Sequence, residues 1–133
     1  MGAWAIDALG NDDAGDWLDT LYDGDGLDVI DETLSAVATL DYIEAPQAAE
    51  ALAAAEVIAR LQGRSDMMAL PYEELDGWVK SSKLAPTLAL VEKAHQAIDR
   101  ILADQSELLE LWQESDEFEA WKASVLNLRS RIR

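Results

Sequence analysis

The sequence predicts an all-α protein, a compact single-domain helical bundle of five to seven helices over residues 1–133. Alanine and leucine are the commonest residues, and both favour helix over strand. Apolar residues recur at steps of three and four, whereas no run of useful length follows the two-residue period of a strand. The three prolines and seven glycines fall where helix ends are expected. A chain of this length is within the usual size of one domain and buries a core of its own.

Three helices are expected in the N-terminal half, at about 12–22, 27–40 and 47–62. Asn11 or Asp12 is placed to cap the first of them. Pro46 suits the first turn of the third helix, and Gly63 suits the position just after its end. The alanine run 53–55 allows another backbone to pack closely against that helix.

Four further helices are expected in the C-terminal half, at about 72–79, 86–104, 106–113 and 116–131. Pro86 is expected to open the long helix. Its apolar stripe steps by four and three through Leu84, Leu88, Val91, His95, Ile98 and Leu102. Asp116 and Glu119 have the spacing of a capping box for the last helix.

The charge is strongly negative and unevenly distributed. Ten Lys and Arg residues stand against 27 Asp and Glu residues, a net charge of −17. Residues 1–59 contain fourteen acids and no Lys or Arg, since Arg60 is the first base. Such a surface promotes solubility, and it also steers a basic partner toward the protein. The acidic balance argues against binding to nucleic acid or to anionic lipid.

Several classes of protein are excluded by what the chain lacks. With no cysteine, there is no disulfide framework, thiol catalysis or cysteine-built zinc site. No apolar run approaches the length of a membrane helix, and no basic residue precedes the first apolar run, as it would in a signal peptide. We therefore expect a cytoplasmic protein.

Catalytic motifs are also missing from the sequence. His95 is the only histidine, so a catalytic triad would have to be built around it. Glu92 and His95 form half of a di-iron motif, but the second copy that such a site requires is absent. There is no nucleophile elbow and no phosphate-binding loop. These absences favour a protein that is not an enzyme.

A calcium site is one alternative function. Asp23, Asp25 and Glu32 match the third, fifth and twelfth positions of an EF-hand loop. The first position, however, is Leu21, where a carboxylate is expected. Asp-Gly pairs are also common in ordinary turns. A calcium-responsive module is therefore kept as an alternative, and no other cofactor is expected except magnesium.

Magnesium binding is the second alternative. Acids recur at steps of three or four, which places them on one helix face, in the sets Asp13, Asp16, Asp19; Asp25, Asp28, Asp31; and Glu107, Glu110, Glu114, Glu117. All-α nucleotide pyrophosphatases bind Mg²⁺ with acids spaced in this way on facing helices. The sequence shows no basic partner for a phosphate nearby, and solvated helix faces have the same spacing. A Mg- or Mn-dependent hydrolase acting on nucleotides is kept as an alternative because of the carboxylate spacing.

Several sequence blocks resemble a known family. They are residues 1–4, 11–18, 44–59, 70–75 and 106–112, and together they extend over nearly the whole chain. They are similar to the bacterial family catalogued as domain of unknown function 4259. The chain departs from the family's pattern at Ala5, where glycine is usual, and in residues 6–10. The resemblance implies a single-domain cytoplasmic bacterial protein, and it implies no reaction.

The leading hypothesis is a non-enzymatic protein-binding module that engages a basic partner. An immunity or inhibitor protein that blocks a nuclease-type toxin is its most concrete form. If the family's pattern marks a site, its tryptophans Trp4 and Trp17 and its cap residues belong to it, although packing and capping explain them equally well. The candidate partner-binding residues are Trp4, Asn11, Asp12, Asp13, Asp16, Asp19, Asp23 and Asp28.

Overall fold

Helix α3 (Ala45–Leu61) is the centre of the molecule, and each of the other six described helices contacts it. The structure is a computed structural model that describes residues 8–64 and 72–133. Every residue from Ala51 to Arg60 is buried. The small alanine side chains allow helices to approach α3 closely from all sides. The expected close packing at alanines 53–55 is confirmed, since all three are fully buried.

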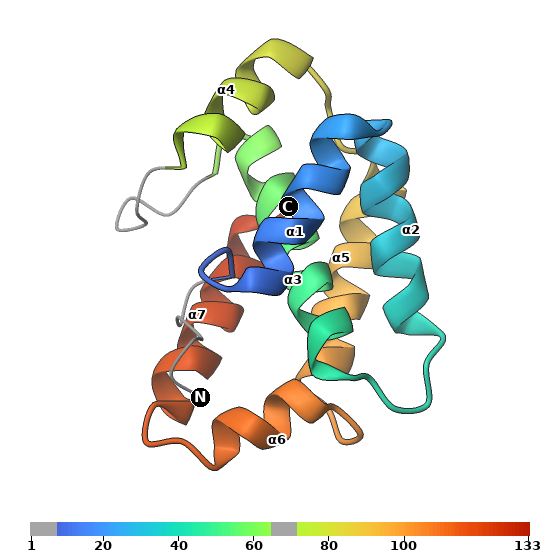
Figure 1. The fold of residues 1–133 in the computed structure, drawn as a ribbon. Helices are drawn as coiled ribbons and strands as arrows, with labels where there is room; N and C mark the ends of the chain where they lie inside the picture. The colour runs from blue at the N-terminus through green and yellow to red at the C-terminus, as the bar shows by residue number, and fades with distance from the viewer. Residues whose placement is uncertain (1–7, 65–71) are drawn as a thin grey trace.

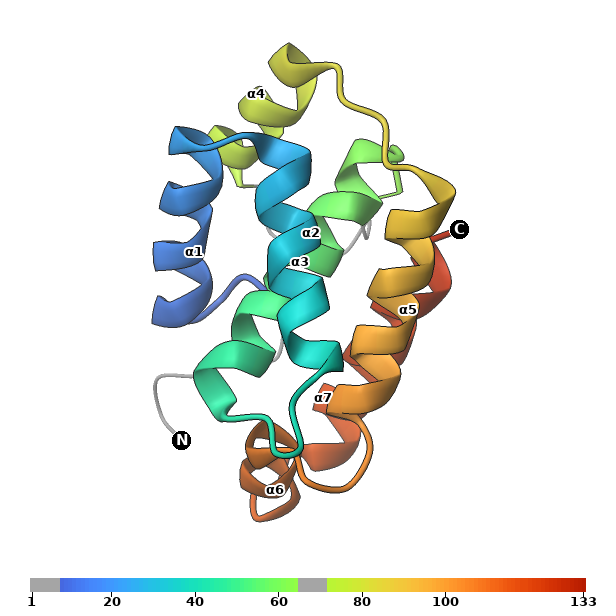
Figure 2. The ribbon, with the colours of Figure 1, turned by 90° about the vertical axis from the view of Figure 1, so that its right-hand side faces the viewer.

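Helices α1 (Asp12–Asp23), α2 (Gly26–Ala38) and α5 (Leu88–Ile101) lie side by side over one side of α3, with α2 in the middle (Figures 1 and 2). Asn11 caps α1, because its Oδ1 accepts a hydrogen bond from the Ala14 amide at 2.9 Å. Trp17 is buried and donates from Nε1 to Thr33 Oγ1 at 2.8 Å, which joins α1 to α2.

The remaining helices cover the other parts of α3. Helix α4 (Glu73–Ser82) lies at one end of the molecule and α6 (Glu107–Gln113) at the opposite end (Figures 1 and 2). Helix α7 (Phe118–Arg131) contacts α3, α5 and α6. On α6 and α7, the rings of Trp112 and Trp121 stack with centroids 5.7 Å apart and planes inclined by 7°.

The all-α prediction is confirmed over the described residues, which form seven helices and only an isolated bridge between Ile43 and Ser106. None of these helices has the length and apolar character needed to cross a membrane. Helix α3 begins earlier than expected, because the Glu44 and Gln47 side chains form a capping box around its first turn. Gly63 follows α3 with a φ of 75°, so the glycine predicted to end this helix is confirmed there.

Two expectations for the C-terminal half are wrong. Helix α5 does not open at Pro86, since the Thr87 side chain caps it by accepting from the Leu90 amide. Leu88, expected to face inward, is 74% exposed. Val91 and Ile98 are buried as predicted, and the rest of the buried stripe consists of Leu90, Ala94, Ala97 and Ile101. Its alanines face the core because α5 packs closely on α2 and α3. The spacing of large apolar residues does not reveal them.

The expected cap of the last helix is also wrong. Helix α7 begins at Phe118 after the N-cap residue Glu117, which makes no side-chain capping bond. Asp116 and Glu119 therefore do not form a capping box. The chain folds Ser115 into the turn instead, where its hydroxyl accepts from the Glu117 amide at 3.0 Å.

Candidate functional site

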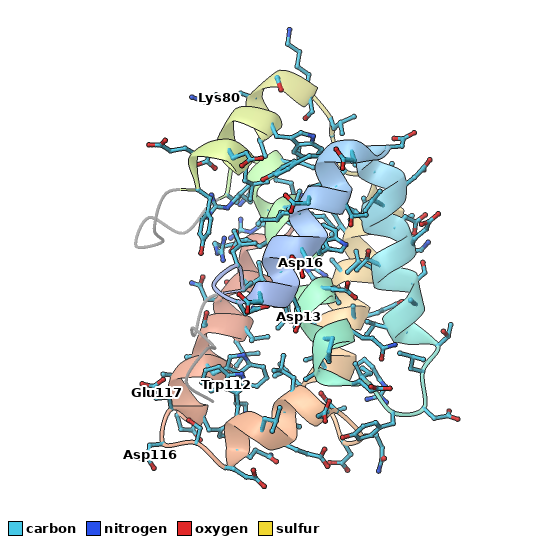
Figure 3. All side chains as sticks on the ribbon, viewed as in Figure 1. Asp13, Asp16, Lys80, Trp112, Asp116 and Glu117 are labelled. Atoms are coloured by element: carbon cyan, nitrogen blue, oxygen red, sulfur yellow. The ribbon has the colours of Figure 1, made fainter. Side chains whose placement is uncertain are left out.

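Helix α1 presents a row of carboxylates to solvent. Asp12, Asp16, Asp19 and Asp23 are exposed and follow one another at steps of four, three and four residues. Asp13 is half-buried beside them, and Figure 3 shows Asp13 and Asp16 on the side of α1 that faces the viewer. Within residues 8–64 and 72–133, no aspartate of α1 is in an ion pair. The row is therefore an unneutralised acidic face.

The acids of α2 are used differently. Asp25 is the N-cap residue of α2, and Asp28 lies exposed in its first turn. A carboxylate at this end of a helix interacts favourably with the helix dipole. Asp31 is paired with Lys93 of α5. The hydrogen bond from Lys93 holds the pKa of the Asp31 carboxyl below its usual range. Of the expected acids on α2, Asp28 is exposed on the side that faces α5, and Asp31 is neutralised.

Many of the bases are bound inside the molecule or far from α1. Arg131 and Arg60 surround Glu56, and Arg129 pairs with Asp99 on the α5–α7 side. Arg100 donates to the backbone carbonyls of Leu40, Asp41, Asp104 and Gln105. These arginines are therefore bound to other groups and do not pair with the aspartates of α1.

A groove of about 500 Å³ separates α1 from the start of α4. Both helices pack on α3. The apolar lining consists of the buried Leu9, Leu18 and Leu75, and Tyr22 and Tyr72 add their aromatic rings. The lining also contains three carboxylates and one glycine, namely Asp19, Glu73, Glu74 and Gly15. No base is among the described lining residues, so the groove combines an apolar floor with a negative rim.

The Tyr22 hydroxyl has a raised pKa in this groove. Burial raises the pKa of its hydroxyl above the ordinary value, and the carboxylates of Glu74, Asp19 and Asp76 raise it further. The Tyr22 ring also contacts Trp78 of α4, with centroids 6.3 Å apart. That contact ties the C-terminal part of α1 to α4.

A second crowded pair of acids lies where α1 meets α3. Burial raises the pKa of the Glu50 carboxyl, and the neighbouring Asp13 carboxylate adds to the rise. A carboxyl whose pKa is higher in the folded state destabilises the fold when ionised, and this effect disappears as the pH falls through the folded-state pKa. The ionised Glu50 beside Asp13 therefore lowers the free energy of unfolding at neutral pH.

We therefore expect Glu50→Gln to raise the melting temperature at neutral pH. The gain should shrink as the pH falls to about 3, well below the pKa of an unfolded glutamate, about 4.3. Thermal melts followed by circular dichroism at both pH values test this, with the exposed Glu92→Gln as the control. An equal gain at both pH values would show that ionisation of Glu50 is not the cause.

The EF-hand geometry is not formed at the expected calcium ligands. Helix α1 ends at Asp23 and α2 already begins at Gly26, so Asp25 is a helix cap and Glu32 lies within α2. An EF-hand needs a twelve-residue loop between its helices. In the part of the chain that the structure describes, no three His, Asp or Glu side chains form a group that could hold a metal ion.

The glutamates of α6 that were considered for magnesium have other contacts. Glu107 Oε1 accepts from the Ala45 amide at 2.7 Å, and Glu110 Oε2 accepts from the Tyr42 hydroxyl at 2.8 Å. That hydrogen bond raises the pKa of Tyr42 to about 12. Glu107 and Glu110 therefore join α6 to the start of α3 and to the segment before it.

The other expected site residues have structural roles or lie outside the described residues. Trp4 is outside them. His95 lies within hydrogen-bonding distance of the Ile132 carbonyl, with Nε2 at 2.8 Å, and helps to hold the C-terminal end of the chain. Sequence reasoning missed Gly15, Glu73 and Glu74 as groove residues. Gly15 shares a helix side with Leu18 and Tyr22, but no sequence signal shows that α4 packs opposite.

The fold and the site together define a small all-α protein with an acidic face that none of its own described bases neutralises. The chain belongs to the family described as Domain of unknown function (DUF4259), whose model matches residues 2–124. This confirms the family suggested by the sequence blocks. No curated protein matches the chain, and no solved structure matches it. Membership in this family assigns no reaction.

Proposed function

We propose that this protein is a non-catalytic binding module that engages a basic protein surface through the acidic face of α1. The observation that carries the proposal is the row of exposed aspartates on α1, none of which is ion-paired in residues 8–64 and 72–133. Exposed charges of one sign steer an oppositely charged partner and fix its orientation. Asp28 on α2 is a further exposed aspartate without an ion pair in the described ranges, and it lies on the side of α2 that faces α5.

An immunity or inhibitor protein is the form of this function that the surface supports best. Proteins that act on nucleic acid are basic where they contact phosphates. A row of carboxylates on a rigid helix offers such a surface an alternative set of anions. The packing of α1 on the buried α3 holds the row in place, so little ordering is required on binding. We place this interaction in the cytoplasm.

Charge reversal tests the proposal. We expect the variant Asp16→Lys, Asp19→Lys, Asp23→Lys, Asp28→Lys to lose a basic partner that the wild-type protein retains from lysate of the source organism. The partner should be released from the wild-type protein by rising salt, because surface electrostatics are screened. Mass spectrometry identifies the partner, and circular dichroism checks that the helical signal is unchanged.

The matched control is Glu92→Lys, Asp104→Lys, Glu114→Lys, Asp116→Lys, four exposed acids away from α1 that change the net charge equally. Figure 3 shows Asp116 at the opposite end of the molecule from α4. We expect this control to retain the partner. Retention by both variants would contradict the proposal. Loss in both would show that total charge, rather than the face of α1, governs binding.

A further inference from the structure

The groove between α1 and α4 differs from the rest of the acidic face because it has an apolar floor. Leu18 and Leu75 are buried, yet their side chains still line the groove. Asp19 on one wall and Glu73 and Glu74 on the other are exposed, and none of the three is in an ion pair within the described ranges. An apolar cleft with a few charged groups at its edge is the usual form of a binding pocket.

Gly15 keeps the α1 wall of this groove open. It is the fourth residue of α1, and within a helix glycine costs roughly 0.5–1 kcal/mol relative to alanine. Packing does not require this glycine, since a Cβ built on it would meet no atom within 4 Å. The same is true of Gly77 in α4, which does not line the groove. The two glycines are therefore matched in the space around them and differ in their position relative to the groove.

The opposite wall is held rigidly. Arg60 lies over the Tyr72 ring, with Cζ 5.4 Å from its centroid, and pairs through Nη1 with Asp76 Oδ1 at 2.8 Å. Arg60 itself is buried in α3. These contacts fix the first turn of α4, which carries Glu73 and Glu74, against the central helix. The groove is thus a preformed feature, and binding to it requires little rearrangement.

We propose that this groove binds a peptide segment of the partner in which a large apolar side chain is flanked by lysine or arginine. The inference rests on the proposed function and names the element of the partner that is recognised. The apolar side chain would lie against Leu18 and the Tyr22 ring, and the flanking cations would pair with the rim carboxylates. A volume of about 500 Å³ suits one or two large side chains rather than a folded domain.

The negative charge of the groove favours this peptide over anionic or purely apolar ligands. An anionic ligand such as a nucleotide would meet Asp19, Glu73 and Glu74 without any base among the described lining residues. A purely apolar segment would leave the three carboxylates next to a surface from which water is excluded, which is costly. A segment that carries both a large apolar side chain and cations packs on the apolar floor and pairs with the carboxylates of the rim. Burial raises the pKa of Tyr22, and the carboxylates of Glu74, Asp19 and Asp76 raise it further.

The experiment is a selection of peptides from a random phage-displayed library on the full-length protein, followed by affinity measurements with the selected peptides. We expect enrichment of peptides that carry lysine or arginine beside leucine, phenylalanine or tryptophan. Gly15→Gln, which places a long side chain over the groove, should weaken their binding by about tenfold or more. Gln is a better helix former than Gly, so this variant should melt at a higher temperature than the wild-type protein.

Two control variants separate the groove from general effects. Gly77→Gln should also raise the melting temperature and should leave peptide affinity unchanged. Glu73→Lys with Glu74→Lys should abolish binding, whereas Asp116→Lys with Glu117→Lys, which changes the net charge equally, should keep it. Loss of affinity in a stabilised Gly15→Gln variant cannot be attributed to unfolding.

The outcomes also separate this inference from the proposed function. Failure to enrich basic peptides, or peptides that bind Gly15→Gln as well as wild type, would overturn the groove assignment. If the intact partner is still lost on charge reversal of α1, the proposed function stands without the groove. If neither peptides nor partner respond to any of these variants, both proposals fail.

Discussion

Replacing Glu56 with alanine is expected to lower the free energy of unfolding by about 3–5 kcal/mol. Glu56 is only 5% exposed and accepts two hydrogen bonds from Arg131, with both N–O distances at 3.0 Å. Arg60, 7% exposed, lies on its other side with Nε 3.4 Å from Oε2. Removing the carboxylate leaves the Arg131 guanidinium without its ion-pair partner and leaves the buried Arg60 with Asp76 alone. A loss of this size is a large fraction of the stability of a typical domain, about 5–15 kcal/mol.

Denaturant unfolding followed by circular dichroism measures this effect. Asp99→Ala is the matched control, because it breaks an ion pair with Arg129 that is exposed and is expected to cost about 1 kcal/mol or less. Glu56→Gln keeps the shape and removes the charge, so it should fall between the two. This variant keeps the prediction testable if the alanine variant does not fold. A loss for Glu56→Ala no larger than for Asp99→Ala would contradict the structural role assigned to the cluster.

Glu56 also shows the limit of what charge counting reveals. In the sequence it is one of fourteen acids in a segment without a base, which indicates a uniformly acidic surface. In the structure it is buried and neutralised by Arg60 and by Arg131, which is 75 residues away. The i,i+4 spacing to Arg60 is visible in the sequence, but the contact with Arg131 depends on how α7 packs on α3. The row of aspartates on α1, in contrast, stays exposed.

The helices themselves could be predicted because their signals are local. Asn11, Pro46 and Gly63 mark helix ends through their own backbone and side-chain chemistry. The inward face of α5 could not be predicted as well, because its centre is occupied by Ala94 and Ala97. Small residues face the core where helices approach closely, and that distance is a property of the packed bundle.

In the candidate site, too, local features could be predicted and features that depend on helix packing could not. The aspartates of α1 were predicted from their spacing, since residues three and four apart share a helix face. The groove could not be predicted, because it exists only where α4 packs beside α1 on their common support α3. Gly15 illustrates this point. A glycine within a helix is a visible anomaly in the sequence, but its position on the wall of a groove becomes evident only in the fold.

Replacing Trp112 with alanine is expected to cost about 3–5 kcal/mol, and the effect should be centred on α6. Helix α6 has seven residues, too few to be stable through helix propensity alone, so it depends on packing. Trp112 is 2% exposed and stacks on Trp121, and such aromatic pairs add about 0.5–1.5 kcal/mol beyond the area they bury.

The conservative variant Trp112→Phe tests whether packing of an aromatic ring accounts for this effect. Trp112 Nε1 is buried and has no hydrogen-bond partner in the part of the chain described here. Phenylalanine keeps an aromatic ring and removes that N–H group, so it should cost clearly less than alanine in the same denaturant experiment. Near-equal losses would show that packing of an aromatic ring at this position does not account for the stability of α6. Figure 3 shows Trp112 far from Lys80 on α4, so both variants should bind the groove peptides normally while they remain folded.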